Sequence, residues 1–262
     1  IYMVYKYRSL GFTKEDWKLH PKYALSLCGM GIPMGLQYSI TAIGSVILQT
    51  AVNSMGETIV AAVAAGTKIS MFACCPFDAM GSTMATYGGQ NVGAGKLDRI
   101  HQGLKDCTKL GFLYSVLALI FMIIFGQKLA LLFVDAKETQ LIHYIYVFLI
   151  GNAAFYTLLT LVNVVRFMIQ GLGYPTFAIL AGVCEMFARG IVGFFLVPAF
   201  GYICVAIASP VAWLCADLFL VPAYFYVMHR LRDKLSPEQS EKVQDSASRN
   251  TAIHYKTAEK IS

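Results

Sequence analysis

Long runs of apolar residues restrict what this chain can fold into more than any other feature. A bilayer core takes roughly 20 helical residues to cross, and five of the six runs are longer than that. Strands of membrane β-barrels alternate over roughly 10 residues, and these runs do not. The pattern predicts an all-α, polytopic membrane protein with six transmembrane helices, at residues 24–52, 57–87, 108–126, 140–170, 174–199 and 202–228.

Composition agrees with a membrane protein and excludes several function classes. The chain is 57% hydrophobic and 14% charged, whereas soluble domains carry about 25% charged residues. The net charge of +6 is spread between apolar runs, so no nucleic-acid partner is predicted. The seven cysteines show no CxxC spacing and the five histidines are scattered, which predicts neither a metal site nor a bound cofactor.

Basic residues gather in alternate connections between the runs. They precede the first run, follow the second and follow the sixth: Lys6, Arg8, Lys14, Lys18, Lys22; Lys96, Arg99, Lys105, Lys109; Arg230, Arg232, Lys234. The connections at 53–56, 127–139 and 200–201 hold only Lys128 and Lys137. Because Lys and Arg are retained on the cytoplasmic side, both chain ends are expected to be cytoplasmic in a multi-pass protein of the cell (plasma) membrane.

The same pattern divides the chain into four parts. Residues 1–8 are expected to end a preceding transmembrane helix, because IYMVY is apolar and Lys6 and Arg8 follow it. The other parts are a cytoplasmic linker, a six-helix lobe and a polar, disordered cytoplasmic tail, at 9–23, 24–228 and 229–262. The chain has no initiator Met, so it is expected to be a fragment or a half of something longer.

A glycine-rich stretch, GGQNVGAGK at 88–96, suggests a phosphate-binding loop at first sight. The GxxxxGK[ST] pattern fails because Gln90 replaces its first glycine and Leu97 its Ser or Thr. The dinucleotide pattern GxGxxG fails at Asp98. The stretch instead predicts a tight cytoplasmic turn, in which Gln90 and Asn91 satisfy carbonyls at a helix end.

GQNVGAGK at the end of a membrane span resembles the signature of the multidrug and toxin extrusion (MATE) family. Three other stretches resemble parts of that family's seventh to eleventh helices: GIPMGLQYSI (31–40), QGLGYP (170–175) and CEMFARGIVGFF (184–195). The resemblance covers about residues 1–230. It implies the C-terminal lobe of a twelve-helix transporter, with Gln90, Asn91, Gly93 and Gly95 in the signature turn.

The sequence departs from the family pattern at two acidic positions. Some members carry a glutamate in helix seven and an aspartate in helix ten for cation coupling. Thr41 matches the first position and an apolar residue near Leu159 the second, with Asn163 one turn on. The resemblance therefore leaves the coupling ion open between H⁺ and Na⁺.

Polar residues inside the runs are the candidate transport path, because polar groups in lipid face a bundle interior or a wet cavity. Two rows recur every three or four residues on one helix face: Gln37, Thr41, Ser45 and Gln49, with Tyr38 beside them; and Asn152, Tyr156, Thr160 and Asn163, continued by Arg166. Either row can equally serve helix–helix hydrogen bonding. Two long rows together favour a polar cavity.

Charged residues inside the runs add three candidates: Glu185, Arg189 and Lys68. Glu185 and Arg189 stand four apart in the order that favours an ion pair. Asp217 is a second possible partner for Arg189. Glu185 has two possible roles: it clamps two helices together, or it changes protonation or holds a cation during transport. Lys68 either lines the cavity or pairs with an acid.

The resemblance implies a cation-coupled antiporter that exports cationic or amphipathic compounds, with the missing N-terminal lobe, membrane lipid and small organic cations as partners. A lipid-linked saccharide or metabolite exporter on the same fold is the nearest alternative, favoured by Lys68, Arg166 and Arg189. A non-transporting half-protein is another. An enzyme is not expected, because no His lies at useful spacing from Asp, Glu or Cys.

Overall fold

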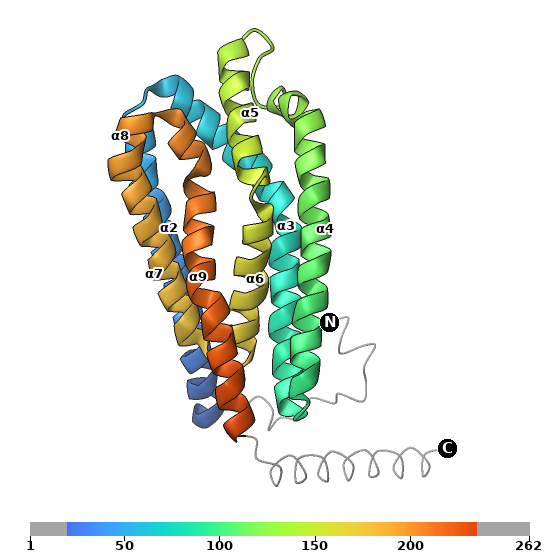
Figure 1. Cartoon of the computed structure of the whole chain (residues 1–262). Helices are drawn as coiled ribbons and strands as arrows, with labels where there is room; N and C mark the ends of the chain where they lie inside the picture. Colours follow the sequence, from blue (N-terminus) through green and yellow to red (C-terminus); the bar gives the residue numbers. More distant parts are fainter. Residues whose placement is uncertain (1–19, 235–262) are drawn as a thin grey trace.

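The computed structural model describes residues 20–234, a part that is almost entirely helical and contains no β-strand. Figure 1 shows its helices running side by side as one bundle. They are α2 (Pro21–Asn53), α3 (Glu57–Gly93), α4 (Leu97–Ala130), α5 (Thr139–Ala153), α6 (Tyr156–Gly171), α7 (Pro175–Ile191), the π-helical turn η1 (Val192–Leu196), α8 (Val197–Phe200) and α9 (Tyr202–Lys234).

Five of these units are long and apolar enough to cross a membrane: α2, α3, α4, α9, and α7 together with η1 and α8. The pair α5 and α6 also passes as a single span, bent by 51° at the junction. The described part therefore holds six candidate spans, which confirms the predicted all-α, polytopic membrane fold.

Several helices extend beyond the boundaries predicted from hydropathy. α2 begins at Pro21, α4 begins at Leu97, and α9 continues to Lys234, so the predicted edges of the linker and the tail lie inside helices. The remaining predictions for both segments, and the preceding helix end at 1–8, fall on residues 1–19 and 235–262, outside the described residues.

The start of α4 shows why hydropathy missed this extension. Leu97, Ile100 and Leu104 are buried at helical spacing, while the basic residues between them are exposed. An amphipathic stretch has a modest average hydropathy, although it forms a helix as readily as an apolar one does. Most of the basic loop predicted between the second and third spans is therefore helical.

The bend between α5 and α6 interrupts what the sequence predicted as a single run. Backbone bonds of the tighter i→i−3 type form there: the Phe155 N–H donates to the Asn152 carbonyl at 3.1 Å, and the Leu158 N–H to the Phe155 carbonyl at 3.0 Å. No Pro or Gly lies between residues 152 and 158, so the common sequence signals of a kink are missing.

The span after the bend contains a wide turn of its own. In η1 the Val197 N–H donates to the carbonyl of Val192, five residues back. Pro198 follows directly, and its ring would clash with the carbonyl of Phe194 in a regular α-helix. The wider π turn relieves that clash. Val197, which directly follows the turn, is buried.

The glycine-rich signature forms a helix end rather than a loop. The sequence predicted a turn over the whole of 88–96, but α3 continues through Gly93 and only Ala94–Lys96 turn. Gly95 has φ +68°, and the Lys96 N–H donates to the Asn91 carbonyl at 2.9 Å, as in a Schellman cap. Three of the four predicted turn residues are therefore helical: Gln90, Asn91 and Gly93.

A glycine also lets α6 approach α3 very closely. A Cβ added to Gly171 would collide with the backbone carbonyl of Ala85, which no side-chain rotation can relieve. Gly171→Ala is therefore expected to lower the free energy of unfolding by about 3 kcal/mol. Thermal unfolding in detergent measures this.

Gly190 in α7 provides the matched control. A Cβ added there meets nothing within 4 Å, so Gly190→Ala is expected to leave stability unchanged or raise it by up to about 1 kcal/mol. Equal melting temperatures for the two variants would show that α3 and α6 do not cross as described.

Candidate functional site

Four charged side chains meet inside the lobe, and we call Arg166, Glu185, Arg189 and Asp217 the charge cluster. They come from α6, α7 and α9 and are only 5%, 2%, 7% and 6% exposed. At roughly 1.5 Å per residue, Glu185 lies about 15 Å from the start of α7, well inside a membrane span. Charges at such depth are rare and usually functional or paired.

Glu185 is the centre of this cluster and contacts two arginines. Arg166 of α6 donates to one carboxylate oxygen, and Arg189 donates to the other at 3.5 Å. The predicted pair of Glu185 with Arg189 is therefore present. The contact with Arg166 was not predicted, because it joins two helices and depends on how they pack.

Asp217 lies beside this ion-paired group without joining it. It is close enough to Arg166 and Glu185 to interact electrostatically, yet neither of its carboxylate oxygens has a hydrogen-bond partner among the described residues. The predicted pairing of Asp217 with Arg189 is not observed there. A buried carboxylate of this kind can still accept bonds from water or hold a cation.

An amide pair connects the same region to α2. The Gln170 side chain of α6 donates to Gln37 Oε1 at 3.0 Å, and both residues are buried. Gln170 Oε1 and Thr41 Oγ1 are buried and have no partner in the part that the structure describes. Gln37 and the Thr41 hydroxyl thus face the lobe interior, and their role in the transport path stays a prediction. Gln170 was missed because it lies at the end of its run.

The remaining residues of the α2 row lie on more exposed positions. Ser45 donates to its own helix, at the Thr41 carbonyl, at 3.2 Å. Gln49 donates to Asn53 at 2.8 Å, and Tyr38 is 56% exposed. Only the part of the row around Gln37 and Thr41 reaches the buried polar region. For Tyr38 and Ser45, a role in the transport path stays a prediction.

The second polar row is sealed inside the lobe, which corrects the prediction of an open polar edge. Asn152 donates to carbonyls of Phe148 and Ala206, at 2.9 and 3.3 Å. Thr160 is hydrogen-bonded to Ser115 across the α4–α6 contact at 3.1 Å. Asn152 and Thr160 thus make hydrogen bonds that join helices, a role that needs no substrate.

Two predicted pathway residues belong to this sealed row. Tyr156 is fully buried and packs against Phe77 and Trp213, with ring centroids 5.4 and 6.2 Å apart. Asn163 is 8% exposed. Neither lies on an open surface of the described part, so direct contact with a substrate stays a prediction for both.

Lys68 is placed differently from the charge cluster. It lies on an exposed position of α3 and has no ion pair among residues 20–234. The predicted pairing of Lys68 with an acid is therefore absent in that part. Its exposed side chain is compatible with the other prediction, that Lys68 lines a cavity.

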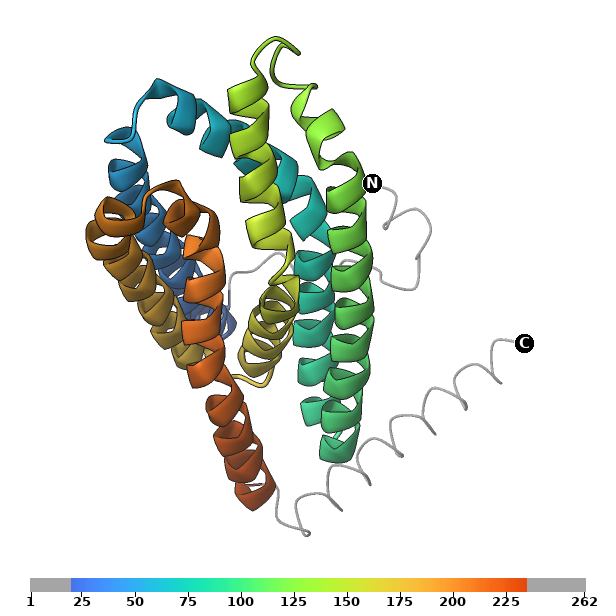
Figure 2. The same cartoon turned by 45° about the horizontal axis from the view of Figure 1, so that its top comes forward.

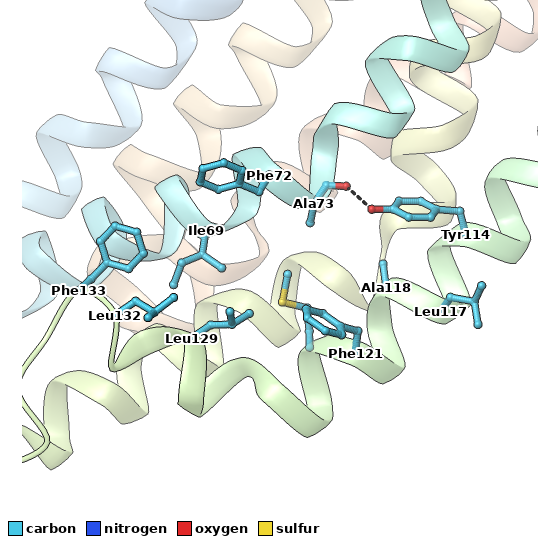
Figure 3. A pocket seen from close by; sticks show the side chains of 11 residues that line it. Ile69, Phe72, Ala73, Tyr114, Leu117, Ala118, Phe121, Leu129, Leu132 and Phe133 are labelled. Carbon is cyan, nitrogen blue, oxygen red and sulfur yellow. Dashed lines mark hydrogen bonds between the residues drawn. The ribbon is translucent and has the colours of Figure 1, made fainter.

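An apolar groove of about 560 Å³ lies between α3 and α4. Figure 3 shows Phe72, Phe121 and Phe133 around it, with the Tyr114 hydroxyl donating to the Ala73 carbonyl at 2.9 Å. No charged residue lines the groove. It has no groups for ion coupling, and its apolar walls suit contact with hydrocarbon.

Comparison with known proteins gives a consistent result. The MatE family model matches residues 33–196. The probable multidrug resistance protein YoeA of Bacillus subtilis (strain 168) is 21% identical over 122 residues, which are 47% of this chain and 26% of that protein.

Solved structures are similar in fold at low identity. A MATE protein in complex with MaL6 superposes with a TM-score of 0.79 at 16% identity, over 88% of this chain and 52% of that one. An outward-facing multidrug resistance MATE transporter of the MOP superfamily gives 0.79 at 17%, over 88% and 53%. A MOP superfamily transporter from Pyrococcus furiosus gives 0.73 at 15%, over 87% and 52%. The chain thus spans about half the length of these structures.

Proposed function

This chain belongs to the MatE family of membrane transporters, and from that premise we propose that it is the C-terminal lobe of a cation-coupled efflux antiporter. The cargo is a cationic or amphipathic compound, held between this lobe and an N-terminal one in the plasma membrane. The match of the family model over residues 33–196 carries the proposal. The signature stretch at 89–96 supports the assignment to the C-terminal lobe, and the basic ends support cytoplasmic termini.

The charge cluster supports ion coupling. Both oxygens of Glu185 contact arginines, so a cation binding there would have to displace a guanidinium. Asp217 has no such partner in the described part and is the carboxylate at which H⁺ or Na⁺ binds and leaves. One bound cation changes the net charge of the cluster by one unit between α6, α7 and α9. That change alters the forces between helices as the lobe moves.

Gradient-driven efflux tests the proposed function. The transporter containing this lobe is reconstituted in liposomes, a proton or a sodium gradient is imposed separately, and efflux of a fluorescent organic cation is followed. Acceleration by one gradient is the expected result. Transport that ignores both gradients would rule out a coupled antiporter.

Export of an anionic cargo is the second candidate, and it is favoured by Lys68, which is exposed and has no ion pair within the described residues. The Pyrococcus furiosus relative is described as having a binding pocket of reverse polarity that suggests a different function, which is said of that protein alone. A cationic side chain attracts an anionic cargo such as a lipid-linked saccharide and repels a cationic one.

Lys68→Ala separates the two candidates. If the cargo is cationic, removing the positive charge is expected to lower the apparent KM for the organic cation by about threefold. If the cargo is anionic, the KM for that cargo rises instead. Lys128→Ala, at the end of α4, is the control, and identical KM values for all proteins would place Lys68 outside the path.

A further inference from the structure

A second groove opens between the beginning of α4 and the end of α9, with α6 as its floor. It holds about 450 Å³, and a connected hollow of about 310 Å³ shares His101, Tyr224 and Phe225 with it. Figures 1 and 2 show these ends of α4 and α9 at the same end of the bundle. The Asp98–Arg232 ion pair at 3.5 Å joins them.

The groove is apolar at one end and basic at the other. Its apolar wall is formed by Phe112, Leu161, Val165, Val221 and Phe225. His101, Lys105 and Lys109 line its other part. Lys105, Lys109 and Phe112 follow one another at i, i+4 and i+7, so one face of α4 passes from charged to aromatic. Such a transition is typical of a membrane-spanning helix where lipid headgroups meet hydrocarbon.

The charge around the groove is predominantly positive. Residues 96–109 and 229–234 contain seven Lys and Arg against three Asp. The acids are in pairs: Asp98 with Arg232, Asp106 with Lys109 at 3.2 Å, and Asp233 with His229 at 3.4 Å. These pairs are exposed to water and therefore weak. Lys105 has no ion pair within residues 20–234.

We propose that this groove binds an anionic phospholipid, with an acyl chain against α6 and the phosphate at Lys105 and Lys109. A free anion would gain nothing from the apolar wall, and an uncharged hydrophobic compound would gain nothing from the lysines. An anionic headgroup joined to an acyl chain matches both halves. None of the four residues of the charge cluster lines the groove, and the proposal does not depend on the transported cargo.

Native mass spectrometry of the detergent-purified chain tests this with two lipids of equal chain length, phosphatidylglycerol and phosphatidylcholine. Each lysine near an anionic headgroup strengthens binding through electrostatic attraction. The double variant Lys105→Ala/Lys109→Ala is therefore expected to bind phosphatidylglycerol about 30-fold more weakly, while phosphatidylcholine binding is unchanged. Lys128→Ala, which removes a lysine at the far end of α4, is expected to behave as wild type.

A second variant tests the apolar wall. Val221 lies on an exposed position, and Val221→Trp fills the groove, so it is expected to weaken binding of both lipids. Melting temperatures identify any variant that fails to fold. Equal lipid retention by wild type and by both folded groove variants would overturn the proposal. So would inorganic phosphate displacing phosphatidylglycerol completely, since that result leaves no role for the acyl chain.

Discussion

Replacing Glu185 by glutamine is expected to lower the free energy of unfolding by about 3–5 kcal/mol. Glu185 is the counter-ion of both Arg166 and Arg189, and all three side chains are buried. The amide keeps the size and shape of the carboxyl but cannot neutralise two guanidinium groups. Two like charges then remain inside a membrane helix bundle. Thermal unfolding in detergent measures the loss.

A matched substitution distinguishes this effect from a general change of charge. Glu57 lies exposed at the start of α3, so Glu57→Gln is expected to shift stability by less than about 0.5 kcal/mol. If Glu185→Gln has the same melting temperature as Glu57→Gln and wild type, the two arginines do not need Glu185 as their counter-ion. The charge cluster is then wrongly described.

Asp217→Asn is expected to leave the lobe folded but to abolish the coupling of transport to the ion gradient. Neither oxygen of Asp217 has a partner in residues 20–234, so the amide breaks no bond there. An amide cannot bind and release H⁺ or hold Na⁺ as a carboxylate does. Gradient-driven efflux is therefore expected to fall on the order of tenfold or more, while the melting temperature stays within a few degrees of wild type.

Asp78 is exposed on α3, and Asp78→Asn serves as the control for removing an acid from a span. Full gradient-driven efflux by Asp217→Asn would place the coupling group elsewhere in the transporter. Unfolding of Asp217→Asn would show instead that the carboxylate makes an essential structural contact. Measuring both quantities on the same preparation keeps these outcomes apart.

The spans were predictable from sequence because the bilayer imposes a length and a composition that can be read residue by residue. The bend between α5 and α6 was not, since Ala154 and Phe155 are ordinary helix residues. Such a junction is set by what packs around it. For example, Asn152 reaches the Ala206 carbonyl of α9.

In the candidate site, too, some contacts were predictable from sequence and others were not. Glu185 with Arg189 was predicted because the pair lies within one helix, where spacing determines contact. The contacts of Arg166 and Gln170, and the lack of a hydrogen-bond partner for Asp217 within residues 20–234, depend on how the helices pack. A row of polar residues shows that a helix face is hydrophilic. It does not show whether that face meets water or, as at Thr160, another helix.

The wide turn η1 has a mechanical consequence. The half of its span before η1 is tied to α6 by the Glu185–Arg166 ion pair, and the half after η1 is packed through Val197 into a cluster that includes Val52 and Val205. A π turn has a looser hydrogen-bond pattern than the helix on either side, so a rotation of the first half is absorbed there before it reaches the second. We therefore expect η1 to act as a hinge between a rotating α7 and a fixed α8.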